Sequence, residues 1–118
     1  MSNDEIKDLF ETLGVTRRYI GYYFLLDAME IVNRDETTLL KVGEYIYEPI
    51  AKKYNCNTAT VERNIRTVIL HIWKNNKGQV EKIMGAKFAT VPTVSEFIDN
   101  LAYYISKGKG KPSNLWYL

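Results

Sequence analysis

The sequence predicts an all-α fold, a compact helical bundle of about six to seven helices that contains a helix-turn-helix. Apolar residues recur at three- and four-residue spacing along most of the chain, which is the period of a helix with one buried face. Alternating apolar and polar runs are short, and turn dipeptides at hairpin spacing are missing, so we expect no sheet. A length of 118 residues with 46% hydrophobic and 25% charged residues fits one globular domain.

Composition narrows the class of protein further. No apolar run approaches the ~20 residues of a membrane span, and the first ten residues lack the order of a signal peptide. The single cysteine excludes an internal disulfide and a cysteine-based zinc site. We therefore expect a cytoplasmic protein without a cofactor, made of one helical domain over residues 1–107 and a flexible basic and apolar tail over residues 108–118.

Three helices are expected in the first part of the chain. The first begins near residue 3 and ends at Gly14. The second runs from a cap at Thr16 to about residue 32 and is apolar over most of its circumference, so it should be the central helix. Arg17 and Arg18 would lie in its first turn, where the helix dipole disfavours cations, as phosphate contacts or as a solvated pair. The third spans residues 36–46 and should bury a set of apolar side chains, Leu39, Leu40, Val42 and Ile46.

The second part of the chain begins with a helix-turn-helix, expected at about residues 47–77. Pro49 is tolerated in the first turn of a short helix over residues 48–54, and Asn55 suits the turn that follows. Asn57 can cap a long helix over residues 58–76. Gly78 marks a break before one or two helical turns that end at Gly85. A capping box, Thr93 to Glu96, then begins the last helix.

The helix at residues 58–76 is a candidate DNA-recognition helix. Ala51 provides the small residue at which two such helices cross, and Val61, ten residues later, returns to the core. The opposite side of the helix carries the polar residues Thr60, Glu62, Arg63, Arg66 and Thr67. Arginine can donate to O6 and N7 of guanine, and glutamate can accept from N4 of cytosine. From Lys52 to Lys77 there are six basic residues and one acidic residue, which suits a phosphate backbone. The alternative is an intrahelical charge network on a solvated face.

Several motifs resemble a known family. They are IAKKYN at 50–55, VER at 61–63, IR at 65–66, PT at 92–93 and SEFI at 95–98. In this order and spacing they resemble the DNA-binding effector domain of the stage-zero sporulation master regulator of spore-forming Firmicutes, over roughly residues 9–105. The resemblance implies sequence-specific binding to short promoter boxes of double-stranded DNA, often in tandem. It also implies a phosphorylated receiver domain before this one, for which the printed chain has no room.

The resemblance also implies roles for individual residues. Glu62 and Arg63 correspond to residues that contact bases, and Thr60 stands where the family has a basic residue, so the preferred DNA sequence should differ. The expected phosphate contacts are Lys52, Lys53, Asn57, Thr58, Arg66 and Thr67. Further expected partners are a second copy of the chain on DNA and RNA polymerase, and no membrane.

A second reading is a protein-interaction module, a decoy or dimerisation partner of a full-length regulator. The missing receiver domain and the apolar residues at 115–118 motivate it. An enzyme is not expected. His71 is the only histidine, Cys56 has no cysteine or histidine near it in sequence, and the GKGK of the tail lacks the strand and helix of a phosphate-binding loop.

Overall fold

The computed structural model describes residues 3–85, 87 and 89–107, and these residues form helices and turns without a strand. The elements are α1 (Asn3–Leu13), α2 (Ile20–Arg34), the 3-10 helix η1 (Glu36–Lys41), the π-helix η2 (Gly43–Tyr47), α3 (Glu48–Lys53), α4 (Thr58–Met84) and α5 (Val94–Lys107). The all-α prediction is confirmed. The predicted tail at 108–118 lies outside the described residues.

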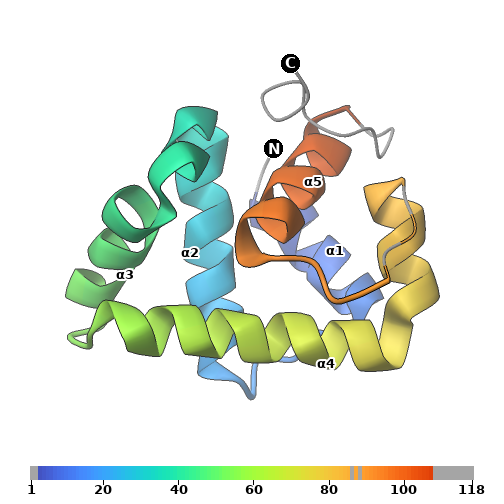
Figure 1. Cartoon of the computed structure of the whole chain (residues 1–118), viewed down its shortest axis with the longest axis horizontal. Coiled ribbons are helices and arrows are strands. Elements are labelled where there is room, and N and C mark those ends of the chain that lie inside the picture. Colours follow the sequence, from blue (N-terminus) through green and yellow to red (C-terminus); the bar gives the residue numbers. More distant parts are fainter. Residues whose placement is uncertain (1–2, 86, 88, 108–118) are drawn as a thin grey trace.

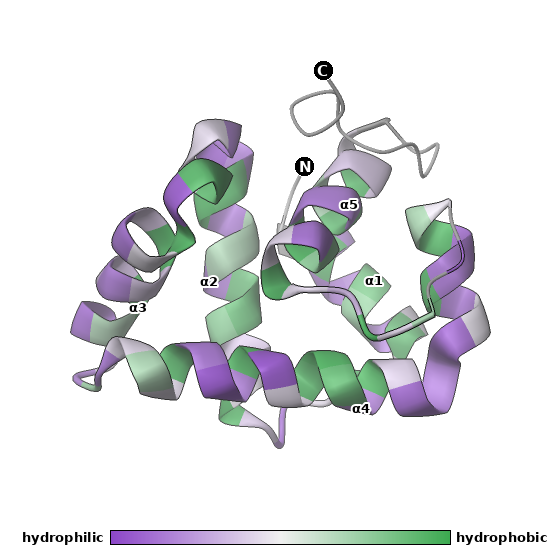
Figure 2. Cartoon of the chain, in the orientation of Figure 1, coloured by the Kyte–Doolittle hydropathy of each residue, from purple (hydrophilic) through white to green (hydrophobic). Residues whose placement is uncertain are grey.

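Helix α4 forms one side of the molecule, and the other α-helices lie on one side of it (Figure 1). The sequence places five apolar side chains along one face of this helix, and four of them are almost fully buried: Val61, Ile65, Val68 and Ile72. The fifth, Trp73, is partly buried against the core. Bands of hydrophobic and hydrophilic residues alternate along α4, as expected for a helix with one buried and one exposed face (Figure 2). The exposed face therefore points away from the rest of the domain.

The predicted start of the second helix at Thr16 is wrong. Gly14 has a φ of +80° and ends α1, with the Val15 amide donating to the Phe10 carbonyl at 2.9 Å. Tyr19 is still extended, with φ −94° and ψ 131°, so α2 begins only at Ile20. Arg17 and Arg18 consequently lie in an exposed turn before α2, and the expected conflict with the helix dipole does not arise. The same shift leaves part of the α2 start solvent-exposed, including Ile20 at 46%.

The third predicted helix is irregular. The segment forms η1 and then η2 instead of one α-helix. Asp35 begins it by accepting from the amide and the hydroxyl of Thr37, at 3.0 and 2.6 Å. Leu39 and Ile46 lie in the core as expected, Val42 is partly buried, and Leu40 beside them is 57% exposed.

The break expected at Gly78 lies instead at Asn76, whose φ of −140° and ψ of 39° interrupt α4. Its side-chain amide donates to the Leu13 carbonyl at 2.8 Å and thereby joins the bend in α4 to the end of α1. The predicted end at Gly85 is confirmed by its left-handed backbone. The capping box before α5 is also confirmed: the Thr93 amide donates to Glu96 Oε1 at 3.0 Å, and the Glu96 amide donates to Thr93 Oγ1 at 3.2 Å.

Candidate nucleic-acid interface

The turn between α3 and α4 is defined by its own hydrogen bonds. The Cys56 amide donates to the Ala51 carbonyl at 2.9 Å, and the Asn55 amide donates to the Lys52 carbonyl at 3.3 Å. Asn55 has a φ of +54°, the left-handed conformation that asparagine tolerates better than most residues. This pair of bonds is a Schellman motif, so the angle between α3 and α4 follows from local chemistry at the predicted turn.

The start of α4 is capped as predicted. Asn57 Oδ1 accepts from the Thr60 amide at 2.8 Å. The Thr60 carbonyl in turn accepts from Asn64 Nδ2 at 2.8 Å. Asn57 and Thr58 are exposed, and Thr60 is half-buried. The two residues predicted to contact phosphate at this helix start are therefore accessible to solvent.

A close crossing with α2 holds the middle of α4 in place. Gly21 on α2 is buried, and a Cβ added there would lie 2.6 Å from Val68 Cγ2 and 2.9 Å from the Asn64 carbonyl carbon. Only a glycine allows the two helices to approach this closely. Two residues before Gly21, the ring of Tyr19 packs against the ring of His71, with 5.6 Å between their centroids. This crossing was not predicted from the sequence, although Gly21 within an apolar segment was a signal for it.

The outward face of α4 carries four of the residues predicted to contact DNA, Thr58, Arg63, Arg66 and Thr67, whereas Thr60 and Glu62 are half-buried. From residue 58 to residue 74, the exposed residues are Thr58, Ala59, Arg63, Arg66, Thr67, Leu70 and Lys74. In the described part of the chain, no hydrogen bond or ion pair engages the Arg63 guanidinium. The Thr67 hydroxyl donates to the Arg63 carbonyl at 2.9 Å, one turn back along the helix. Arg63 therefore presents all its side-chain donors to solvent.

Glu62 and Arg66 form an ion pair on this face. Arg66 Nη2 donates to Glu62 Oε1 across one helical turn. The side chain of Glu62 is 26% exposed and that of Arg66 is 62% exposed, so the pair remains in contact with water. A predicted base contact and a predicted phosphate contact are thus joined to each other in the free protein.

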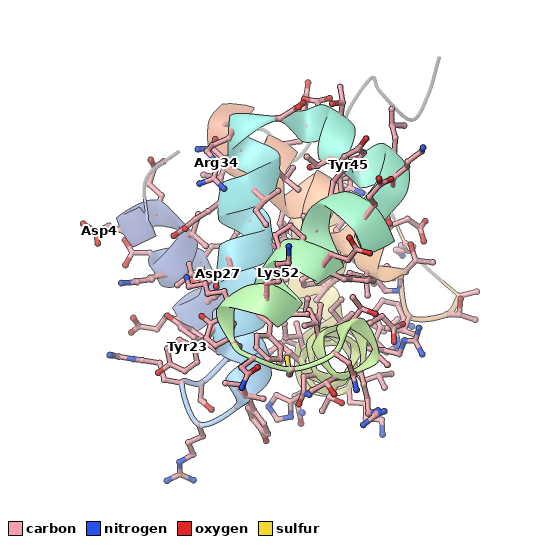
Figure 3. The ribbon with its side chains drawn as sticks, turned by 90° about the vertical axis from the view of Figure 1, so that its left-hand side faces the viewer. Asp4, Tyr23, Asp27, Arg34, Tyr45 and Lys52 are labelled. Carbon is pink, nitrogen blue, oxygen red and sulfur yellow. The ribbon has the colours of Figure 1, made fainter. Side chains whose placement is uncertain are left out.

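The two predicted lysine contacts on α3 differ in their surroundings. Lys53 Nζ lies 3.0 Å from Oδ2 of Asp27 on α2, and its hydrogen bond to Asp27 raises the pKa of Lys53. Lys52 is exposed and carries no ion pair with any residue that the structure describes. In Figure 3, Lys52 lies on α3, and Asp27 and Tyr23 lie on α2. Lys53 therefore holds α3 against α2, and Lys52 keeps its charge free.

A hollow borders α4 on the flank opposite to the one that faces α2. It is lined by Tyr47, by four α4 residues that include Glu62, Arg66 and Leu70, and by residues 91–95. Burial raises the pKa of the Tyr47 hydroxyl, while the nearby Arg66 lowers it. The segment before α5 thus follows α4 on the side of Arg66, a contact that the sequence analysis did not predict.

Among the described residues, no group of three or more histidine, cysteine, aspartate or glutamate side chains is placed to hold a metal ion. None of the described helices is long and apolar enough to cross a membrane. His71 is half-buried between Tyr19 and Asn75.

Comparison with known protein families gives one match. The family model described as "Sporulation initiation factor Spo0A C terminal" matches residues 6–105. The matched segment includes the whole of α2, α3 and α4 and most of α1 and α5.

Proposed function

The chain belongs to the Spo0A C-terminal family of DNA-binding sporulation regulators, and we propose that it binds double-stranded DNA sequence-specifically with α4 in the major groove. On this proposal, the chain regulates transcription by binding promoter boxes in the DNA of the nucleoid, in the cytoplasm. Two copies on tandem boxes and a contact with RNA polymerase belong to the same proposal.

The observation that carries it is the free Arg63 guanidinium on the outward face of α4. The major groove is about 12 Å wide and a helix with its side chains about 10–12 Å, so one helix fills the groove. An arginine at the centre of the outward face then reaches base edges. Its paired donors match O6 and N7 of guanine, and one such contact discriminates between bases by ~1–3 kcal/mol.

Glu62 and Thr60 complete the proposed base contacts. Glu62 lies beside Arg63 in sequence and can accept from N4 of a cytosine. Its ion pair with Arg66 lowers the cost of bringing a carboxylate close to phosphates, because the pair has no net charge. Thr60 has a short side chain and one hydroxyl, which supports a different base preference from a relative with a basic residue there.

Phosphate contacts are proposed on both sides of the turn. The exposed Lys52 provides a free cation, and Asn57 and Thr58 lie where the positive end of the α4 dipole favours an anion. Thr67 and Arg66 lie further along the same helix. Lys53 is the weakest member of the predicted set, since a phosphate would have to compete with Asp27.

The test is a binding selection over random duplexes with the full chain. The proposal expects one enriched motif, with affinity that falls steeply as salt rises because neutralised phosphates release their counterions. Absence of both enrichment and salt-sensitive binding would overturn it. That result would favour the protein-interaction module, which predicts a complex with a full-length regulator instead.

A further inference from the structure

The turn between α1 and α2 lies beside the exposed face of α4. Figures 1 and 3 show this turn reaching past α4 on the side away from α5. The contact between Tyr19 and His71, with 5.6 Å between ring centroids, fixes the turn against α4. Gly21 then packs α2 onto the Asn64 backbone, so the turn and the start of α2 contact α4 at two points.

This turn carries two adjacent arginines. Arg17 and Arg18 are both exposed, and no residue of the described chain pairs with either side chain in an ion pair. Two neighbouring free cations repel each other, and an opposite charge that approaches both would relieve that repulsion. The unpaired positive charges of Arg17 and Arg18 therefore indicate an anionic partner.

Successive residues of α4 are rotated by about 100° around the helix axis, so the side of the helix on which each residue lies can be assigned. His71 and Asn64 mark the flank of α4 that faces α2, and Thr60 and Thr67 lie between that flank and Arg63. The hollow at Arg66 marks the other flank. A helix that fills the major groove has a phosphate backbone along each of its flanks. The turn at Arg17 and Arg18 therefore meets the backbone on the Thr67 side.

We propose that Arg17 and Arg18 form a second phosphate-binding site, which contacts the DNA backbone along the flank of α4 that faces α2. This inference rests on the proposed function, because it requires α4 to occupy a groove. Phosphate contacts position the protein without distinguishing bases, so the pair adds affinity for every duplex and leaves sequence preference unchanged.

The experiment compares two variants that lose the same charge. Arg17→Gln/Arg18→Gln removes the proposed contacts. Arg34→Gln/Lys41→Gln removes two exposed cations at the end of α2 and in η1, away from α4 (Figure 3). Binding of each full chain to a 20-base-pair duplex of mixed sequence is measured between about 50 and 200 mM salt, the range over which phosphate contacts change affinity most. Thermal unfolding confirms that both variants are folded.

The slope of log affinity against log salt decides the matter. Each lost phosphate contact should reduce its magnitude by about 1, so Arg17→Gln/Arg18→Gln should reduce it by roughly 2 and the control should leave it nearly unchanged. Equal slopes for the two variants, whether both unchanged or both reduced, would overturn the site. If the wild-type chain bound no duplex, the proposed function would be overturned as well. That outcome distinguishes failure of the proposed function from failure of the Arg17 and Arg18 site alone.

Discussion

A methyl group at Gly21 should force α2 away from α4. In Gly21→Ala the new Cβ lies 2.6 Å from Val68 Cγ2 and 2.9 Å from the Asn64 carbonyl carbon, and it is closer still to the carbonyl oxygen. Ordinary contact begins at 3.4 Å, so the α4 backbone itself has to shift. Overpacking of this kind costs about 1–3 kcal/mol, against a gain of roughly 0.5–1 kcal/mol from replacing glycine inside a helix. The expected net loss of unfolding free energy is about 1–2 kcal/mol.

The assay is urea unfolding, with Gly78→Ala as the matched control. Gly78 lies exposed in α4 with no atom within 4 Å of an added Cβ, so only the helix-propensity gain of roughly 0.5–1 kcal/mol applies there. The two alanine variants should therefore change stability in opposite directions. If Gly21→Ala were as stable as Gly78→Ala, the close crossing would not hold α4 as described.

Three further predictions concern single side chains. Asn57→Ala removes the cap on the Thr60 amide and should cost about 1 kcal/mol in urea unfolding, whereas Asn57→Asp should keep the cap but weaken duplex binding through its negative charge. Asn76→Ala removes the hydrogen bond to the Leu13 carbonyl and should cost roughly 1 kcal/mol, and an unchanged stability would show that the bend in α4 does not depend on that bond. The hydrogen bonds from Thr37 to Asp35 lower the pKa of that carboxyl below its ordinary value of 3.8, so the stability they provide is present above pH 3.8 and is lost as pH falls through the lower folded pKa. Unfolding measured from pH 6 to pH 2 should therefore show less acid destabilisation for Asp35→Asn than for wild type, and parallel curves would contradict the assignment.

Local chemistry explains why the helix-turn-helix could be predicted from sequence. Pro49, Asn55 and Asn57 each act through hydrogen bonds or backbone angles within a few residues, and so does the capping box at Thr93. Exposure of Arg63 followed from the helical period alone. These features depend on residues that are close together in the sequence, so they could be predicted without knowing the fold.

Two of the errors come from contacts between distant residues, and the misplaced start of α2 has a local cause. Thr16 has the chemistry of a cap, but the motif that ends α1 at Gly14 and the extended Tyr19 delay the start of α2. The bend in α4 lies at Asn76 rather than Gly78 because Asn76 bonds to a residue 63 positions earlier. Lys53 is paired with Asp27, 26 positions away, so its charge is not free in the unbound protein, which the sequence did not indicate.

The most direct test of the central claim is base discrimination by Arg63→Ala. Affinity is measured for the duplex enriched in the selection and for a scrambled duplex of the same composition, with Lys52→Ala as the control. Loss of one bidentate guanine contact should lower the affinity ratio of the two duplexes by roughly 5- to 150-fold, the equivalent of ~1–3 kcal/mol. Lys52→Ala should weaken both duplexes alike and leave the ratio unchanged. A wild-type ratio in Arg63→Ala would contradict the claim that α4 distinguishes bases through this residue.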